Sequence, residues 1–258
     1  VRGLAKKHVS AASLVVIENA TGDLLAYVGS PDIEDEAHLG HNDGVLALRQ
    51  PGSTLKPFLY ELAMERLDFS ASTSLPDIDL YLPTKDADYH PVNYDGRLHG
   101  PVRLREALAN SYNIPAVWTA SALGPGRVLE RLRELGMSSL SEDAEHYGAA
   151  IALGDGEVRL LDLAAAYATL ARGGIWKPVR PLQGALAKDG TPLPLPASPD
   201  RRVMDEADAF VITDILADKN ARLASFGAGS TAVALTGALL LAVGLGLAAL
   251  VWYVQDKF

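Results

Sequence analysis

The chain has 258 residues and a formal net charge of −9; 48% of its residues are hydrophobic and 21% are charged. This composition excludes a disordered or collagen-like chain, and the negative charge argues against sequence-independent nucleic-acid binding. Cysteine is absent, which excludes thiolate nucleophiles, disulfides and thiolate metal sites.

The N-terminal part predicts a β-hairpin followed by helices. Two β-prone runs, residues 13–17 and 24–28, are joined by a polar turn that contains Gly22. Hydrophobic spacing and helix-end signals then predict five helices, over residues 53–67, 104–110, 127–135, 158–171 and 205–217. The helix at 104–110 is followed by a predicted break before Pro115.

Two long segments lack a helical period. Residues 70–100 mix Pro, Asp, Tyr and Asn, and loops of this length are usually functional. Residues 178–199 carry six prolines, which indicates an irregular surface excursion or a weak hairpin.

The C-terminal tail is strongly apolar. No charged residue lies between Arg222 and Asp256, and residues 231–254 would span about 36 Å as a helix, against about 30 Å of hydrocarbon. Trp252 and Tyr253 stand at its end, where amphipathic rings favour a membrane interface. We therefore predict a soluble domain over residues 1–227 and an apolar tail, 228–258, with a transmembrane helix at 231–254. A buried core helix is the alternative.

The first candidate catalytic motif is Pro51-Gly-Ser53-Thr-Leu-Lys56. Ser and Lys three residues apart at a helix start share one face, so the Lys56 amine can take the Ser53 hydroxyl proton if burial depresses its pKa. The helix N-terminus favours the anion formed on attack. Alone the pattern is also that of a Ser cap followed by a surface Lys.

A second motif, Ser111-Tyr-Asn113, follows the helix at 104–110. Serine acyl-transferases that recognise penicillin place such a Ser-x-Asn pair across the cleft from the Ser-x-x-Lys pair. Ser111 could relay a proton to the leaving amine, and Asn113 could hold a substrate amide. A Ser/Asn turn before a proline is the alternative.

Three segments carry a wider resemblance: QPGSTLKPFLYELAME, DADYHPVNYDGRLHGPVRLREALANSYNIPAV and ALGDGEVRLLDLAAAYATLARGG. Together they resemble the transpeptidase domain of class A penicillin-binding proteins over residues 10–227. The resemblance implies an α/β (α+β) fold of the serine β-lactamase and transpeptidase type, an antiparallel sheet flanked by helices. It implies Ser53 as nucleophile, Lys56 as general base, and Ser111 and Asn113 as the second motif.

The resemblance also implies substrates and location. Peptidoglycan stem peptides ending in D-Ala-D-Ala and β-lactams would acylate Ser53, on the extracytoplasmic side of a bacterial inner membrane. No cofactor and no nucleic-acid partner is expected. No metal is expected either, since His38, His41 and Asp43 lie in an acidic loop where a solvated role is favoured.

The chain departs from the family at its third motif, Lys-Thr/Ser-Gly. Lys188-Asp-Gly-Thr191 has the wrong second residue and comes too early, so a turn is expected there, while Leu235-Thr-Gly237 lacks the lysine. We therefore expect a domain that is incomplete at its C-terminal end, with an unpaired sheet edge and impaired activity.

Three interpretations of function and two of the tail stay open. The chain is a weak transpeptidase, a non-catalytic membrane-tethered remnant that binds partners, or, ranked lower, a D,D-carboxypeptidase or β-lactamase. The tail is either part of a longer exported product that lacks its N-terminal portion here, or the result of a fusion or reading-frame change.

Overall fold

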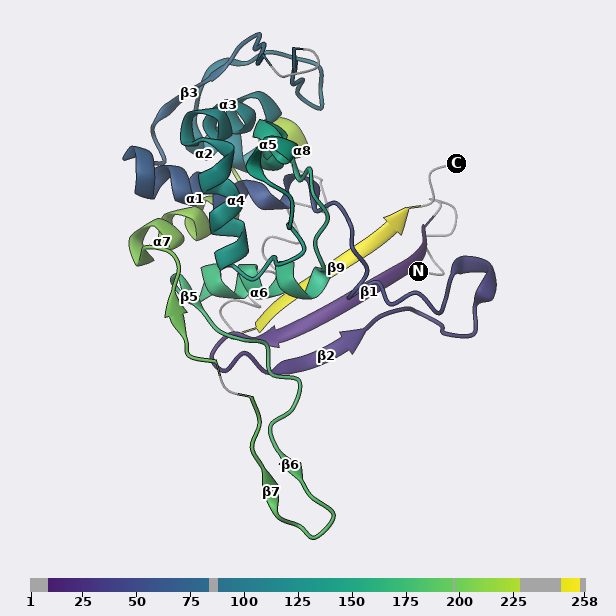
Figure 1. Cartoon of the computed structure of the whole chain (residues 1–258). Coiled ribbons are helices and arrows are strands. Elements are labelled where there is room, and N and C mark those ends of the chain that lie inside the picture. The colour runs from purple at the N-terminus through teal and green to yellow at the C-terminus, as the bar shows by residue number, and fades with distance from the viewer. Residues whose placement is uncertain (1–8, 84–87, 197, 228–246, 256–258) are drawn as a thin grey trace.

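The computed structural model describes residues 9–83, 88–196, 198–227 and 247–255 (Figure 1). Its strands are β1 (Val9–Glu18), β2 (Leu24–Val28), β3 (Ser74–Asp77), β4 (Gly100–Arg103), β5 (Ile175–Trp176), β6 (Ala185–Leu186), β7 (Pro192–Leu193), β8 (Arg201–Arg202) and β9 (Leu247–Gln255). Its α-helices are α1 (Lys56–Leu67), α2 (Leu104–Ala109), α3 (Asn113–Leu123), α4 (Pro125–Glu134), α5 (Ala144–Tyr147), α6 (Leu160–Ala171), α7 (Glu206–Ala217) and α8 (Leu223–Phe226). Short 3-10 helices are η2 (Glu36–His38), η3 (Gly52–Leu55) and η4 (Gly148–Leu153).

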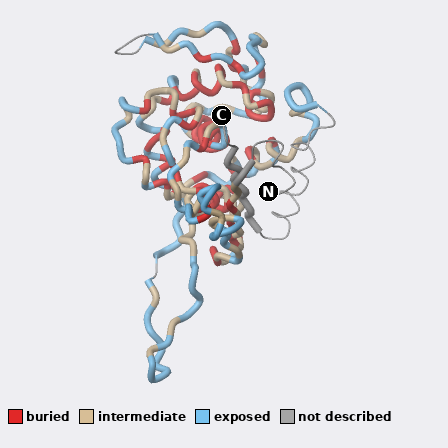
Figure 2. Tube along the Cα trace, turned by 90° about the vertical axis from the view of Figure 1, so that its right-hand side faces the viewer, coloured by how far each residue is buried: buried red, intermediate tan, exposed pale blue. Residues whose placement is uncertain are grey.

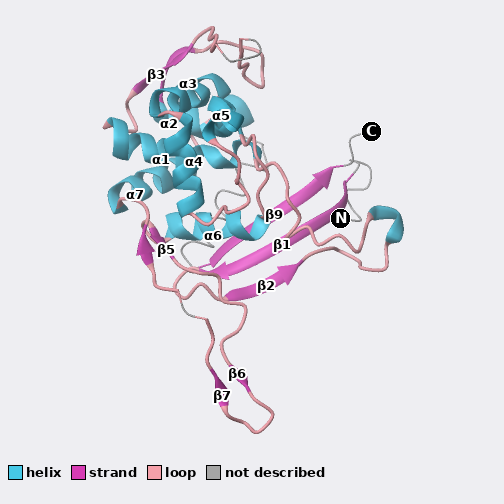
Figure 3. Cartoon of the chain, in the orientation of Figure 1, coloured by secondary structure: helices cyan, strands magenta, loops and turns pink. Residues whose placement is uncertain are grey.

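A three-stranded antiparallel sheet of order β2-β1-β9 forms one layer. β1 is its centre: Leu14 pairs with Val28 on one side and with Val251 on the other. The predicted hairpin of β1 and β2 is thus confirmed. α6 lies over this sheet (Figure 3), and Val15 and Ile17 of β1 are buried against Leu160 and Ala164. Burial of these apolar side chains stabilises the contact between the layers.

The tail differs from its predicted structure. Where a transmembrane helix was predicted over 231–254, residues 247–255 form strand β9; residues 231–246 lie outside the described residues. The run Val251-Trp-Tyr-Val254 is rich in β-formers, and β1 offers a row of backbone N–H and C=O groups that need partners. β9 pairs with the edge of β1 that faces away from β2 and is itself an edge strand of the three-stranded sheet, so the sheet has one strand more than the predicted hairpin. None of the helices in the described part of the chain is long and apolar enough to cross a bilayer.

The helices form the second layer, with α1 at its centre (Figures 1 and 3). Every residue of α1 from Lys56 to Met64 is buried, as expected for a helix packed on all sides by α3, α4 and α7. The buried core follows these helices, whereas the β6–β7 hairpin projects away from it and is mostly exposed (Figure 2). This burial fixes the start of α1 rigidly in the molecule.

The five predicted helices are present, with ends shifted by a few residues. Three α-helices were missed: α3 and the one-turn helices α5 and α8. The predicted break before Pro115 is instead the first turn of α3, where a proline is tolerated because the N–H it lacks has no partner within the helix. The proline-rich segment forms the weak hairpin of β6 and β7, with Lys188 in its turn.

Candidate active site

Ser53 and Lys56 lie where η3 passes into α1. The backbone N–H of Lys56 donates to the Ser53 carbonyl, so the two residues stand one helical turn apart. Ser53 is exposed, whereas Lys56 is only 1% exposed. The turn therefore presents a hydroxyl at the surface with an amine buried just behind it.

The Lys56 ammonium binds three neutral oxygen acceptors. It donates to the Ser111 carbonyl at 2.7 Å, to Ser111 Oγ at 3.1 Å and to Asn113 Oδ1 at 2.7 Å. The fold thus brings Lys56 together with two residues that lie 55 and 57 positions later in the sequence. In the described part of the chain, no carboxylate pairs with this amine.

Burial lowers the pKa of Lys56 from 10.5 to about 7. The desolvated ammonium loses hydration, and neutral oxygens do not offset that loss fully. An amine with such a pKa is partly deprotonated near neutral pH and can accept a proton. A surface lysine would not, so a merely solvated Lys56 is excluded by its burial.

Ser111 holds an unusual backbone conformation. Its φ is +58°, in the left-handed region that L-residues other than Asn and Asp rarely adopt. This turn directs both the Ser111 carbonyl and hydroxyl at Lys56, directly before α3 begins at Asn113. Strained backbone of this kind persists only where the surroundings hold it.

Two contacts support the turn that carries Ser53. The Tyr167 hydroxyl of α6 donates to the Thr54 carbonyl at 2.9 Å. Gly154, at the end of η4, has φ +84°, and a Cβ there would lie 2.2 Å from the backbone N of Gly52. The backbone of residue 154 therefore packs directly behind the serine turn, in a space that only glycine fits.

The arrangement brings together a hydroxyl, a buried amine of low pKa, a second hydroxyl and an amide. The N-terminal turn of α1 adds a partial positive charge near Ser53. Such a set suits nucleophilic attack by serine with a lysine general base, and hence acyl transfer.

Comparison with known families matches residues 12–234 to the penicillin-binding protein transpeptidase domain. The chain belongs to this family. Penicillin-binding protein 1C of Escherichia coli (strain K12) is 33% identical over 210 residues, which are 81% of this chain and 25% of that protein. The chain thus spans a quarter of the length of this curated relative.

Two solved structures share the transpeptidase fold. Penicillin-binding protein 1A from Haemophilus influenzae matches with a TM-score of 0.70 at 24% identity, covering 81% of this chain and 35% of that one. PonA1 from Mycobacterium tuberculosis in complex with penicillin V matches with a TM-score of 0.66 at 24% identity, covering 83% and 58%. The predicted family and α/β serine transpeptidase fold are confirmed.

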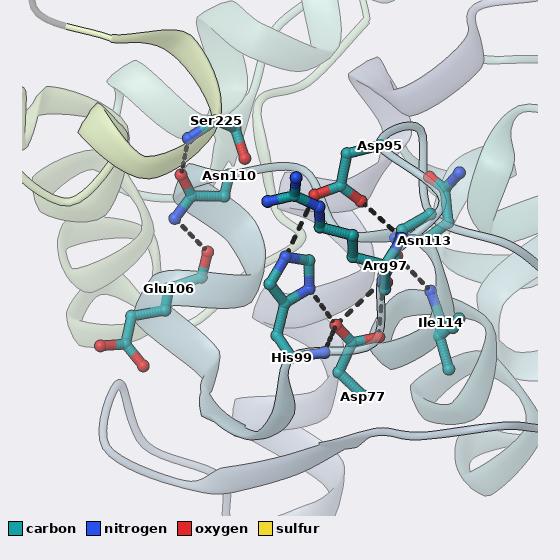
Figure 4. Close-up of polar contacts among 10 residues, drawn as sticks. Asp77, Asp95, Arg97, His99, Glu106, Asn110, Asn113, Ile114 and Ser225 are labelled. Carbon is teal, nitrogen blue, oxygen red and sulfur yellow. Dashed lines mark hydrogen bonds and ion pairs between the residues drawn. The ribbon is translucent and has the colours of Figure 1, made fainter.

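The transpeptidase domain also contains polar residues that the sequence motifs did not single out. Asn93 and His99, in the long segment 70–100, contact the Ser111–Asn113 turn. Asp77, in the same segment, binds Asn93 and His99, and Figure 4 shows it beside His99. The only signal for them was the unusual length and polarity of that segment. Of the two imperfect matches to the third motif, Lys188 lies in the distal hairpin, and Leu235-Thr-Gly237 lies outside the described residues.

Proposed function

We propose that this transpeptidase domain performs serine acyl transfer on peptidoglycan stem peptides ending in D-Ala-D-Ala, and that β-lactams acylate the same serine. The observation that carries the proposal is the buried Lys56 amine, which reaches both Ser111 and Asn113 and stands one turn behind the exposed Ser53. The penicillin V complex of PonA1 adds support from the same fold.

In the proposed reaction, neutral Lys56 takes the proton of Ser53 as its Oγ attacks the penultimate D-Ala carbonyl. The C–N bond to the terminal D-Ala then breaks; Ser111 gives its hydroxyl proton to that leaving amine and is reprotonated by the Lys56 ammonium, which donates to Ser111 Oγ. The ester on Ser53 is resolved by an acceptor amine, which forms the new amide and frees the hydroxyl. Asn113 Nδ2 donates to the Val92 carbonyl, so substrate would meet this amide in a fixed orientation.

We further propose that turnover is impaired. The sequence contains no Lys-Thr/Ser-Gly motif, so the cation for the substrate carboxylate and one donor to the oxyanion are not supplied in the usual way. Loss of one oxyanion-hole donor costs about 3–4 kcal/mol, or a factor of 10² to 10³ in rate. Slow acylation with little turnover is the expected behaviour.

The missing motif also favours a second function, a non-catalytic domain that binds partners. A carboxypeptidase or β-lactamase ranks lower, because no deacylating carboxylate is assigned. For the transpeptidase function we propose the extracytoplasmic face of a bacterial inner membrane, where the stem peptides are cross-linked.

Labelling with a fluorescent penicillin tests the proposal. The wild-type chain is compared with Ser53→Ala and with Ser70→Ala, an exposed serine beyond the opposite end of α1. We expect slow covalent labelling that Ser53→Ala abolishes and Ser70→Ala leaves unchanged. Labelling that is absent, or that survives in Ser53→Ala, refutes the acyl-transfer proposal for this chain.

A further inference from the structure

A buried polar chain leads from β3 to the start of α3. Asp77 is fully buried and Asn93 is 4% exposed. Asn93 Nδ2 donates to both Asp77 carboxylate oxygens, at 2.8 and 2.9 Å, and to the Arg97 carbonyl at 2.8 Å. Asn93 Oδ1 accepts from the backbone N–H groups of Asn113 (2.8 Å) and Ile114 (3.3 Å). Every polar atom of the Asn93 side chain is therefore used.

This amide replaces a local helix cap. The residue before α3, Tyr112, supplies no side-chain cap, so the first N–H groups of α3 depend on Asn93 from a distant loop. The neighbouring Val92 carbonyl accepts from Asn113 Nδ2 at 2.9 Å. Residues 92 and 93 together hold both the backbone and the side chain of Asn113.

His99 fastens the other side of the same turn. Its backbone N–H donates to Asp77 Oδ2 at 3.1 Å, and its ring Nδ1 lies 2.5 Å from the same oxygen (Figure 4). Its ring stacks on Tyr112 at 4.1 Å between centroids, and its Nε2 lies 3.2 Å from Asp95. Tyr112 is the middle residue of the Ser-x-Asn motif, so the stacking of the His99 and Tyr112 rings restrains this turn.

Burying a carboxylate and an amide in a core costs free energy, because both groups lose their hydration. Apolar side chains of similar volume are often as stabilising, so polar groups of this kind are better explained by the geometry that they impose. Here that geometry concerns two residues: Asn113, whose Oδ1 accepts from Lys56, and Ser111, in its left-handed conformation.

We propose that Asn93, held by Asp77, is a positioning residue that keeps Ser111 and Asn113 in place against the Lys56 amine. The inference deepens the proposed acyl-transfer function and rests on it for its biological meaning. Asn93 acts on the reaction only through Asn113 and Ser111.

An exchange of the two side chains provides a specific test. Asn93→Ala removes the cap, Asn93→Asp alone sets two carboxylates face to face, and Asp77→Asn alone sets two amides face to face. The double variant D77N/N93D restores one amide and one carboxylate, with the new carboxylate at position 93 facing the N–H groups of α3, while the Arg97 carbonyl loses the donor that Asn93 supplied. Val128→Ala is the control, since it removes buried volume from α4 without touching the network.

The readout is the titration of the Lys56 side chain by NMR with isotope-labelled lysine, the signal being assigned by its loss in Lys56→Arg. The partners of this amine are the Ser111 carbonyl and hydroxyl and the Asn113 amide oxygen, all neutral; no ionisable side chain of the described residues binds it. A looser turn over the amine admits water, and the titration midpoint of Lys56 then rises toward the ordinary lysine pKa.

We expect Asn93→Ala to raise the Lys56 midpoint by about 0.5 pH unit or more, and D77N/N93D to return part of that shift. Val128→Ala should leave the midpoint unchanged at a comparable loss of melting temperature. An unchanged midpoint in Asn93→Ala, an equal shift in Val128→Ala, or no recovery in the double variant overturns the inference. Because this readout needs no acylation, it decides the inference even if penicillin labelling refutes the proposed function.

Discussion

The packing of Gly154 against the serine turn yields a sharp stability prediction. A Cβ on residue 154 would lie 2.2, 2.5 and 2.6 Å from the N, Cα and O atoms of Gly52, all of them backbone atoms that cannot rotate away. In Gly154→Ala the left-handed φ of +84° adds about 1–2 kcal/mol of strain. Displacing the neighbouring backbone adds about 1–3 kcal/mol. We expect a total loss of about 2–5 kcal/mol in the free energy of unfolding.

The matched control is Gly190→Ala. Gly190 has φ +85°, almost the same as Gly154, but a Cβ there meets nothing within 4 Å. It should therefore show the conformational strain alone, about 1–2 kcal/mol. Urea unfolding measures the two losses, and with a slope of about 2 kcal/mol/M the Gly154→Ala midpoint should fall by about 1–2.5 M.

The same pair separates stability from positioning. Gly154→Ala should slow penicillin acylation of Ser53 under conditions where the variant is folded, because the serine turn must shift to admit the methyl group. Gly190→Ala should not. If the two variants lose equal stability and are acylated equally fast, the close approach of residue 154 to Gly52 is not what holds this turn.

Three further outcomes follow from the described contacts. Acylation should rise about tenfold from pH 6 to pH 8 because Lys56, with a pKa of about 7, must lose its proton to act as base; a flat pH–rate profile contradicts this. Tyr167→Phe, which removes the hydrogen bond to the Thr54 carbonyl, should lower the free energy of unfolding by about 1 kcal/mol in urea, and a neutral result argues against that bond. Arg131→Met should lower the free energy of unfolding by about 3–5 kcal/mol, because Glu61 then stays buried without its partner. Adding Glu61→Leu should recover most of that loss in thermal unfolding, and a double variant that shows no recovery excludes this explanation.

Local signals made much of this site predictable. The Ser53–Lys56 pair occupies one helical turn, so spacing alone places the two side chains on one face. Ser111 and Asn113 could be joined to them only through the family resemblance, because no spacing rule links residues 55 positions apart. The burial of Lys56, which gives the amine its low pKa, depends on α3 and its preceding turn and so appears only in the folded chain.

The supporting residues were harder to foresee for a physical reason. Asp77 and Asn93 sit in a segment without helical or strand period, where polar side chains are usually solvated. Only the fold shows that they are buried and joined to one another. The start of α3 was missed likewise, since its cap comes from a loop 20 residues earlier in the sequence rather than from the residue before the helix.

The tail shows where hydropathy misleads. An apolar run of this length predicts a spanning helix, yet β9 pairs with β1 from Val9↔Gln255 to Glu18↔Leu247.

A strand and a helix respond differently to proline. Among the described strands β9 pairs with β1 alone, so its successive N–H groups point alternately toward β1 and away from it. A proline scan over residues 248–253 should therefore cost alternately about 3 kcal/mol and much less. A helix loses a hydrogen bond at every interior position and should show uniform losses. Melting temperatures of the six variants distinguish the two patterns, and uniform losses would refute the pairing of β9 with β1.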